Sequence, residues 1–450
     1  MITIFVELSK YLLIILFALY TYECFAVFRR KNDEWKRNTI YNKQLLFMFL
    51  IHADAFLVIF LMEKEWDILA FYGMQVLFLI VLQAGYRILY KRSNRLLLNN
   101  MSMLLTIGFI MMSRLDFLKA ERQFIIVLIS ACITFLIPFI IENIKLLRNM
   151  TWIYGGVGLA MLLIVAILGA TSYGAKISFT IAGITLQPTE FVKILFVFFI
   201  AGRFYISTEF KQIVITSAFA AAHVLILAAS KDLGGALIFF VVYIVMLYVA
   251  SQHLYYFVAG ILGGCVASVV AYKIFSHVRV RVIAWRTPLS VINKEGYQIC
   301  QSLFAIGTGG WFGLGLYQGM PKTIPVVEQD FMFSAIAEEL GGVFAICLIM
   351  VCVSCFFMFI NIALQMHDFY YKLVALGLGV VYGFQVFLTL GGVTKFIPST
   401  GVTLPFVSYG GSSMLATFII FSIIQGLYIR RQDEGEIDDD FTKKSYQTYE

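Results

Sequence analysis

Hydrophobic residues gather in this chain into long continuous stretches, which short polar segments separate. Each stretch is close to the roughly 20 residues that an α-helix needs to cross a lipid bilayer. The thirteen stretches cover residues 4–28, 44–62, 66–86, 97–113, 123–142, 151–171, 189–206, 211–229, 234–250, 254–275, 331–361, 370–392 and 410–429. The pattern therefore predicts an all-α polytopic membrane protein.

The composition narrows the class of protein further. Of the 450 residues, 60% are hydrophobic and 14% are charged, and the mean hydropathy is +0.86. These values exclude a soluble globular enzyme and a disordered protein. The seven cysteines lie mostly inside apolar stretches, where cysteine behaves as a small hydrophobe, so a disulfide scaffold is excluded as well.

Basic residues indicate which connections face the cytoplasm. They cluster between residues 29 and 43 and between residues 87 and 95. Because cytoplasmic loops carry the excess of Lys and Arg, the N-terminus is expected outside, together with the long connection 276–330. The acidic end, 431–450, is then a cytoplasmic tail, which its composition predicts to be disordered. The net charge of +7 reflects these loops and not nucleic-acid binding.

Two outer segments depart from this charge rule. Arg114, Lys119 and Arg122 follow the fourth stretch on the side assigned to the outside. The connection 276–330 is also cationic, which suggests an anionic ligand, because its Lys and Arg are not needed for orientation. A merely solvated loop is the alternative.

Polar residues at the borders of the apolar stretches are the next candidates. Glu190 and Lys193 lie three positions apart, on one helical face, where they can form an ion pair. Asp232 stands at the start of a stretch, as an N-cap would. His52 and Asp54 interrupt the second stretch, where a buried structural hydrogen bond accounts for them best.

Two adjacent acids lie deeper in an apolar stretch. Glu338 and Glu339 follow Phe331, and a carboxylate at this position must face a polar interior or a partner.

Five polar segments occur in an order that is typical of one protein family. They are residues 187–193, 232–234, 296–310, 325–341 and 400–413. In residue types and spacing they resemble the signatures of the SEDS family, the RodA, FtsW and SpoVE proteins of cell shape, division and sporulation. The resemblance covers residues 98–430, so residues 1–97 lie outside it. It implies a ten-helix SEDS core preceded by about three extra transmembrane helices.

The resemblance also implies an activity and a set of site residues. Family members are peptidoglycan glycosyltransferases, which polymerise lipid II on the outer face of the bacterial cytoplasmic membrane. Asp330 matches the position of the family's catalytic carboxylate, which suits a general base. The substrate-binding candidates are Arg279, Arg281, Lys322, Gln298 and Gln301, and the candidates for cavity-shaping polar groups are Glu190, Lys193, Asp232, Glu338, Glu339 and Ser412.

The leaving group and the cross-linking step require further components. A divalent metal ion of unknown identity is a candidate for stabilising the negative charge of the departing pyrophosphate.

No serine is followed three positions later by lysine, so the Ser-x-x-Lys motif of transpeptidases is absent. The resemblance implies a class B penicillin-binding protein as the partner that cross-links the strands.

The sequence departs from the family pattern at three places. Lys231 stands where the family usually has proline, Val326 where it usually has glutamate, and residues 177–179 where a tryptophan is common. These departures concern regulation and substrate fit more than the reaction.

Two other functions fit the same apolar helices. A lipid II flippase needs polar groups through the depth of the membrane, whereas a polymerase needs them gathered on the outer face. A non-catalytic scaffold of the cell-wall synthesis complex would share the helices and would not require Asp330. The sequence does not decide between elongation, division and sporulation.

Overall fold

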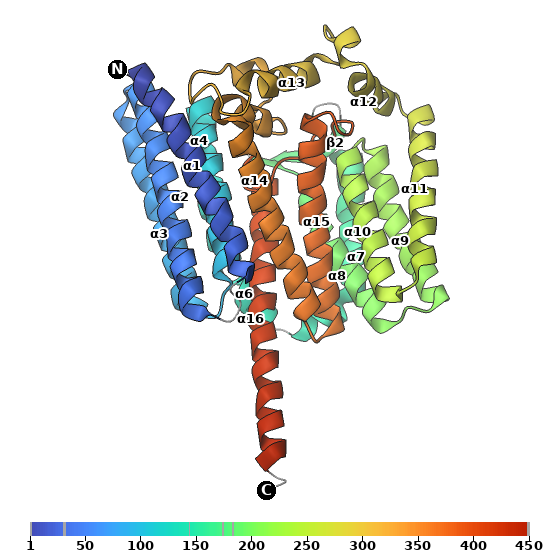
Figure 1. Ribbon diagram of the computed structural model, residues 1–450. Helices are drawn as coiled ribbons and strands as arrows, with labels where there is room; N and C mark the ends of the chain where they lie inside the picture. Colours follow the sequence, from blue (N-terminus) through green and yellow to red (C-terminus); the bar gives the residue numbers. More distant parts are fainter. Residues whose placement is uncertain (1, 30–32, 144, 173–174, 182–183, 448–450) are drawn as a thin grey trace.

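The computed structural model describes residues 2–29, 33–143, 145–172, 175–181 and 184–447 as a bundle of long helices (Figure 1). The long helices are α1 (Ile2–Arg29), α2 (Glu34–Glu63), α3 (Trp66–Leu89), α4 (Arg95–Leu115), α5 (Phe117–Thr134), α7 (Thr151–Leu168), α8 (Thr189–Ile206), α9 (Phe210–Ala229), α10 (Leu233–Ser251), α11 (Leu254–Ile274), α14 (Met332–Gln365), α15 (Phe369–Val393) and α16 (Gly411–Gln447). The short helix α6 (Ile137–Asn143) and the 3₁₀ turn η1 (Lys145–Met150) join α5 to α7.

Twelve described helical segments are long and apolar enough to cross a membrane, where the sequence predicts thirteen. The thirteenth is α8, which runs among the others in the bundle (Figure 1). Its 18 residues include Glu190, Lys193 and Arg203, so α8 has the highest density of charged residues of the predicted spans. Charged residues inside a span are costly unless they pair or face a cavity, so α8 is a candidate for function.

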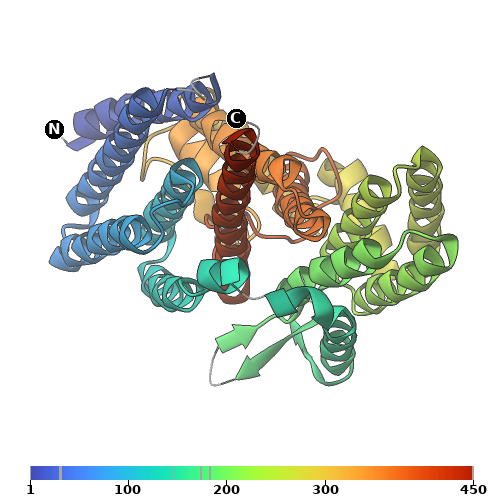
Figure 2. The same ribbon diagram turned by 90° about the horizontal axis from the view of Figure 1, so that it is seen from below.

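The first three helices pack against one side of the remaining bundle (Figure 2). A buried polar network joins them to it: the Tyr20 hydroxyl donates to Asn100 Oδ1 over 3.0 Å, and Asn100 Nδ2 donates to Ser354 Oγ over 3.1 Å. Asn99 Nδ2 donates to Gln44 Oε1 over 2.9 Å. Hydrogen bonds between helices hold them together where the hydrophobic effect cannot, so the extension is fixed to the core.

The core begins with α4, whose apolar window is completely buried. Among the described residues it continues through α5 with α6, then α7 to α11, and ends with α14 to α16, which makes ten spans. Helix α16 lies near the middle of the bundle, and α11 lies at its edge with no buried residue (Figures 1 and 2). The prediction of a ten-helix core with three extra helices is confirmed.

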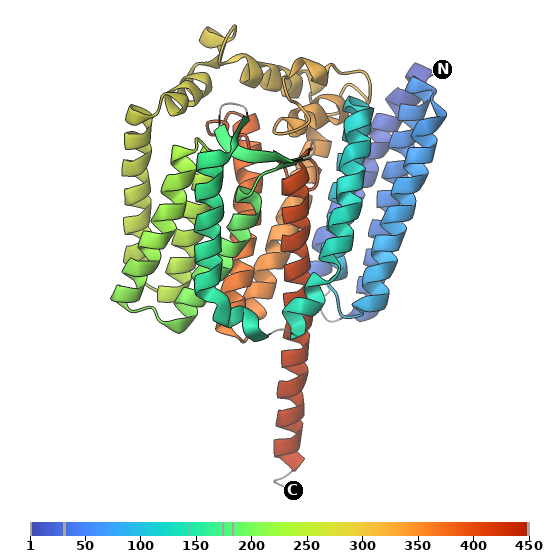
Figure 3. The same cartoon turned by 180° about the vertical axis from the view of Figure 1, so that it is seen from behind.

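A small antiparallel sheet, in the order β1-β2-β3, joins α7 to α8 at one end of the bundle (Figure 3). Its strands are β1 (Ala170–Ser172), β2 (Ala175–Ile181) and β3 (Ile184–Leu186). Strands β1 and β3 have only three residues each, too few to show an alternation, but β2 alternates apolar and polar residues over its seven positions and its pattern was missed.

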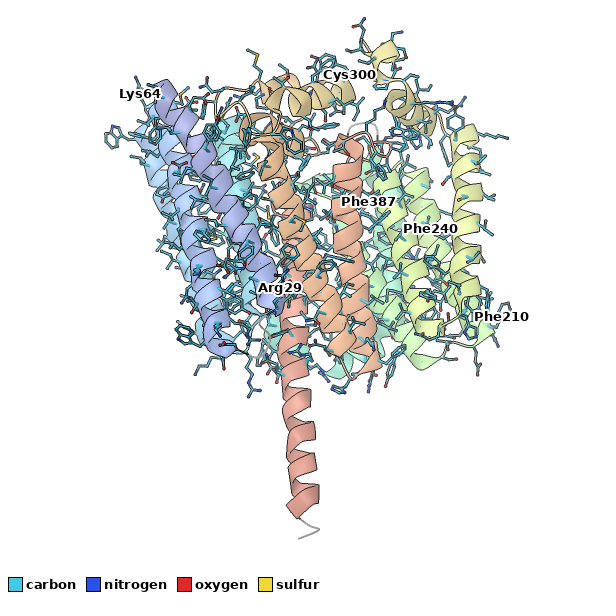
Figure 4. All side chains as sticks on the ribbon, in the orientation of Figure 1. Arg29, Lys64, Phe210, Phe240, Cys300 and Phe387 are labelled. Carbon is cyan, nitrogen blue, oxygen red and sulfur yellow. The ribbon has the colours of Figure 1, made fainter. Side chains whose placement is uncertain are left out.

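The connection 276–330 covers the same end of the bundle. It consists of α12 (Ser276–Arg286), the 3₁₀ turn η2 (Pro288–Val291), α13 (Tyr297–Gly309), the 3₁₀ turn η3 (Pro321–Thr323) and loops. The N-terminus lies at this end and the C-terminus at the opposite end (Figure 1). Lys64 and Cys300 mark the first end, and Arg29 and Phe210 mark the second (Figure 4). This arrangement is the one that the basic loops predict.

The glycine-rich part of this connection lies directly on the start of α14. The amide of Leu314 donates to the carbonyl of Glu338, and that of Gly315 donates to the carbonyl of Glu339, over 3.0 and 2.8 Å. Gly341 interrupts α14 with φ of 89°, and a Cβ atom there would lie 2.7 Å from the carbonyl oxygen of Trp311. Only glycine permits this backbone conformation and close approach without strain.

Two of the three cations that follow α4 and depart from the charge rule have ion-pair partners. Arg114 forms an ion pair of 2.9 Å with the buried carboxylate of Glu339, and Lys119 pairs with Glu328. These residues therefore hold the outer connection in place. The ion pair of Glu339 with Arg114 confirms the prediction that a carboxylate at this position faces a polar interior or a partner.

The acidic C-terminal segment was predicted to be disordered, but α16 continues through it as far as Gln447 and projects from the bundle (Figure 1). Extending a helix that is already formed fixes the backbone of only one residue for each hydrogen bond that is added. Glu434 and Glu436 are also good helix formers. The disorder of this segment stays a prediction.

Candidate functional site

A cavity of about 850 Å³ opens beneath the outer connection, and we call it the central cavity. It lies between the first turns of α8, α10 and α16, the helices α12 and α13, and the loop before α14. The residues that line it include Arg122, Ser178, Glu190, Lys193, Lys231, Asp232, Arg281, Trp285, Glu295, Gln298, Val326, Asp330, Ser399, Thr400, Gly401 and Ser412. The five motif segments thus meet in one chamber, together with residues of α5 and α12, and their polar side chains line part of its wall.

Asp330 lies in this cavity, one residue before the N-cap of α14. Its Oδ2 lies 3.9 Å from where a Cβ atom of Gly401 would be, so the 400–413 segment leaves room beside the carboxylate. Burial raises the pKa of Asp330 to about 6, and the positive charge of Arg281 opposes that rise. A carboxylate with a pKa near 6 is ionised at neutral pH and can still accept a proton, as a general base must.

Arg281 is a cation of the central cavity whose charge acts on two carboxylates, Asp232 and Asp330. Its Nη1 donates to the carbonyl oxygen of Ser399 over 3.3 Å, which fixes α12 against the loop after α15. Burial lowers the pKa of Arg281, while the charges of Asp232 and Asp330 act against that change. The guanidinium therefore lies close enough to both acids to interact with them electrostatically.

Asp232 caps α10 as predicted: its Oδ1 accepts from the amide of Gly235 over 2.8 Å. Its other oxygen, Oδ2, is buried and has no partner among the described residues. Burial raises the pKa of Asp232, and the nearby charge of Glu190 raises it further. A buried acceptor without a partner, on the wall of a cavity, is suited to contact a ligand.

The predicted pair of Glu190 and Lys193 is present, with Nζ and Oε2 2.6 Å apart. Lys193 Nζ also donates to Gln385 Oε1 over 2.7 Å. The hydroxyl of Ser412 accepts from the amide of Gln187 over 2.8 Å, which joins the start of α16 to the residues before α8. These groups line the central cavity and brace its inner wall.

Gln298 supports the segment that carries Asp330. Its Nε2 donates to the carbonyl oxygen of Pro325 over 2.9 Å. Beyond this bond the chain passes through Val326, which has φ of 55°, a left-handed conformation that is costly for a β-branched residue. Strain of this kind occurs where surrounding contacts hold a functional loop in one shape.

Other predicted residues do not join the central cavity. Arg279 is exposed on α12 and does not line it, nor does Gln301. Glu338 and Glu339 lie under the loop instead, where Glu338 accepts from the amide of Met320 over 2.9 Å and Glu339 pairs with Arg114. Lys322 lines a separate cavity.

The structure adds cavity residues that the sequence analysis did not select. Arg122 was recognised only as a departure from the charge rule, and Thr400 only as the first residue of a motif. The hydroxyl of Thr400 is buried and unpartnered among the described residues, and this orientation becomes visible only in three dimensions.

The central cavity does not provide a complete set of metal ligands. Within the described ranges no group of three or more His, Cys, Asp or Glu side chains is placed to hold an ion.

Known proteins share this sequence and this fold. The family model described as cell cycle protein, of FtsW, RodA and SpoVE, matches residues 94–433. Peptidoglycan glycosyltransferase RodA of Mycobacterium bovis is 32% identical over 413 residues, which is 84% of this chain and 88% of that protein. Stage V sporulation protein E of Bacillus subtilis is 31% identical over 357 residues, covering 72% of this chain and 93% of the relative.

Solved structures agree on the fold. A chain from a peptidoglycan synthase complex that coordinates polymerization and crosslinking has a TM-score of 0.64 and 23% identity, covering 75% of this chain and 98% of the other. The rod shape determining protein RodA of Thermus thermophilus has a TM-score of 0.55 and 22% identity, with coverage of 75% and 96%. With its motifs, its helical core and the family match over three quarters of its length, the chain belongs to the cell cycle protein family of FtsW, RodA and SpoVE.

Proposed function

We propose that this protein is a peptidoglycan glycosyltransferase that polymerises lipid II on the outer face of the bacterial cytoplasmic membrane. The observation that carries the proposal is the placement of Asp330 beside Arg281 in the central cavity. Relatives over most of the chain bear the name peptidoglycan glycosyltransferase, which supports the same activity.

The reaction joins two lipid-linked disaccharides. The 4-hydroxyl of one attacks the anomeric carbon of the other, and the bond from that carbon to the pyrophosphate oxygen breaks. Asp330 accepts the hydroxyl proton as the new glycosidic bond forms. The pyrophosphate leaves with the bonding electron pair, and Arg281 stabilises its negative charge.

The distribution of polar groups favours this reaction over lipid transport. Glu190, Lys193 and Asp232 lie in or beside the first turns of their helices, at the end of the bundle covered by the outer connection. A flippase requires polar groups along the whole path across the membrane. A scaffold would not require a carboxylate with a raised pKa in a cavity of this size.

The direct test is polymerisation of purified lipid II by the purified protein in detergent or in vesicles. We expect glycan strands longer than the dimer, which gel electrophoresis resolves. Movement of lipid II across a vesicle bilayer without any glycan product would favour the flippase instead.

The pKa of Asp330 predicts how the rate depends on pH. The base works only when it is deprotonated, so activity should be full well above pH 6, half-maximal near pH 6, and should fall about tenfold for each further pH unit. The measurement is the initial rate of polymerisation between pH 4.5 and 8.5, with thermal stability recorded at each pH. A rate that is constant between pH 5 and 8 would contradict the assignment.

Labelling of cysteines tests the orientation in the membrane. In a background that lacks the seven native cysteines, one introduced at 312–324 should react with an impermeant thiol reagent in intact cells. One introduced at 33–43 should react only after the cells are opened. The reverse pattern would place the central cavity in the cytoplasm and remove the site from its proposed location.

We propose a class B penicillin-binding protein as the partner, because this chain lacks a Ser-x-x-Lys motif and its strands need cross-linking. The solved complex that coordinates polymerization and crosslinking supports such a pairing. Co-purification from the native membrane should recover a transpeptidase, and adding it should raise the rate of glycan synthesis. Full activity that no transpeptidase changes would count against a functional pair.

A further inference from the structure

A second cavity, of about 530 Å³, lies beside the central cavity at the same end of the bundle, and we call it the side cavity. One wall comes from the N-terminal extension, where Glu63 ends α2 and Glu65 caps α3. A second wall runs from Ser113 in the last turn of α4 to Lys119 in the first turn of α5. The third is the loop from Lys322 to Glu328. Because the extension supplies a wall, the ten-helix core alone does not form this cavity.

The loop that leads to Asp330 separates the two cavities. Val326 lines both of them, while residues 324, 325, 327 and 328 line the side cavity and residues 329 and 330 line the central cavity. Val326 is thus the boundary that the two cavities share, and a ligand that occupies both would lie across it.

One buried polar group in the side cavity has no partner within the protein. Ser113 is only 5% exposed, and its hydroxyl makes no hydrogen bond to any described residue. A hydroxyl buried without a partner costs free energy, typically about 1–3 kcal/mol. On the wall of a cavity, such a group is available to a ligand.

Charged groups of both signs also remain available. Arg114 and Lys119 are already paired, with Glu339 and Glu328. Glu65 and Lys322 are exposed, and neither has an ion-pair partner among the described residues. One carboxylate and one ammonium on different walls match a ligand that carries both an amine and a carboxylate.

We propose that the side cavity binds the peptide stem of the lipid-linked disaccharide. The stem is a short peptide with free amino and carboxylate groups, and it branches from the same sugar that carries the pyrophosphate. The inference rests on the proposed function, because it takes the sugar to be held in the central cavity. Lys322 pairs with a stem carboxylate, Glu65 with a stem amine, and the Ser113 hydroxyl with a peptide group.

The experiment compares two substrates for the purified full-length protein. One is lipid II with its complete stem, and the other is the same lipid-linked disaccharide with the stem trimmed to its first residue. For Ser113→Ala and Lys322→Ala we expect KM for the complete substrate to rise about tenfold, with kcat unchanged. A tenfold rise corresponds to the net binding free energy of about one hydrogen bond to a charged group. For the trimmed substrate, KM should equal that of the unmodified protein.

Two controls separate binding from folding. Ser113→Ala removes a hydroxyl that bonds to nothing described in the protein, so it should not lower the Tm. Lys294→Ala removes a matched exposed lysine from the same outer connection, outside both cavities, and should leave KM unchanged for both substrates.

Other outcomes overturn the proposal. If KM for the complete substrate is unchanged in both variants, or rises equally for both substrates, the side cavity does not bind the stem. If the variants alter only activation by a transpeptidase, the cavity is a protein-docking site instead. If the unmodified protein polymerises neither substrate, the proposed function fails first, and this inference falls with it.

Discussion

Asp330→Asn should reduce the rate of lipid II polymerisation by about 10² to 10⁴, the usual cost of losing a positioned general base. Asparagine keeps the shape and volume of the side chain and removes its ability to accept a proton. Because Asp330 precedes α14 and, among the described residues, its carboxylate hydrogen-bonds only to its own backbone, folding should be preserved. The rate is measured with purified lipid II, and the Tm of the variant is measured beside it.

A matched substitution distinguishes the loss of the general base from the loss of a single negative charge elsewhere on the protein. Asp67→Asn makes the same chemical change at an exposed position in the first turn of α3, at the same end of the bundle and outside both cavities. It should stay within about threefold of the unmodified rate, because a single exposed charge near a helix end contributes little. Equal rates for Asp330→Asn and Asp67→Asn would show that Asp330 is not the base.

Arg281→Met should lower kcat by about 10²-fold, in line with the loss of one group that stabilises charge in the transition state. Methionine keeps an unbranched side chain that fills the same space but loses the hydrogen bond to the Ser399 carbonyl, so the Tm of the variant is measured beside the rate. The substitution also removes the cation that lowers the pKa of Asp330. The acidic limb of the pH–rate profile should therefore move to higher pH, which a merely structural defect would not cause.

The matched control is Arg279→Met, two residues earlier on the same helix. Arg279 is exposed and lies outside the central cavity, so its loss should change kcat little. The sequence could not rank these two arginines, and the structure does. If Arg279→Met were as damaging as Arg281→Met with the same shift in pH profile, the assignment of Arg281 to the leaving group would be wrong.

Residues 1–97 show where local sequence loses its predictive power. Their apolar stretches predict three helices, but nothing local indicates that Asn100 bonds Tyr20 on one side and Ser354 on the other. Those bonds join positions 80 and 254 residues apart. A lone asparagine in a helix has no preferred partner until neighbouring helices pack against it.

The membrane-spanning architecture was determined by the sequence, because a bilayer accepts only long apolar helices and basic loops indicate their direction. Local chemistry also determined the ion pair of Glu190 with Lys193 and the cap formed by Asp232, since both depend on residues three positions apart. The tertiary structure alone decided that Arg281 enters the central cavity while Arg279 faces away. It also decided that Arg114 pairs with Glu339, 225 residues away, and that the extension completes a second cavity. Such contacts depend on how distant helices pack, and no local pattern of residues encodes that arrangement.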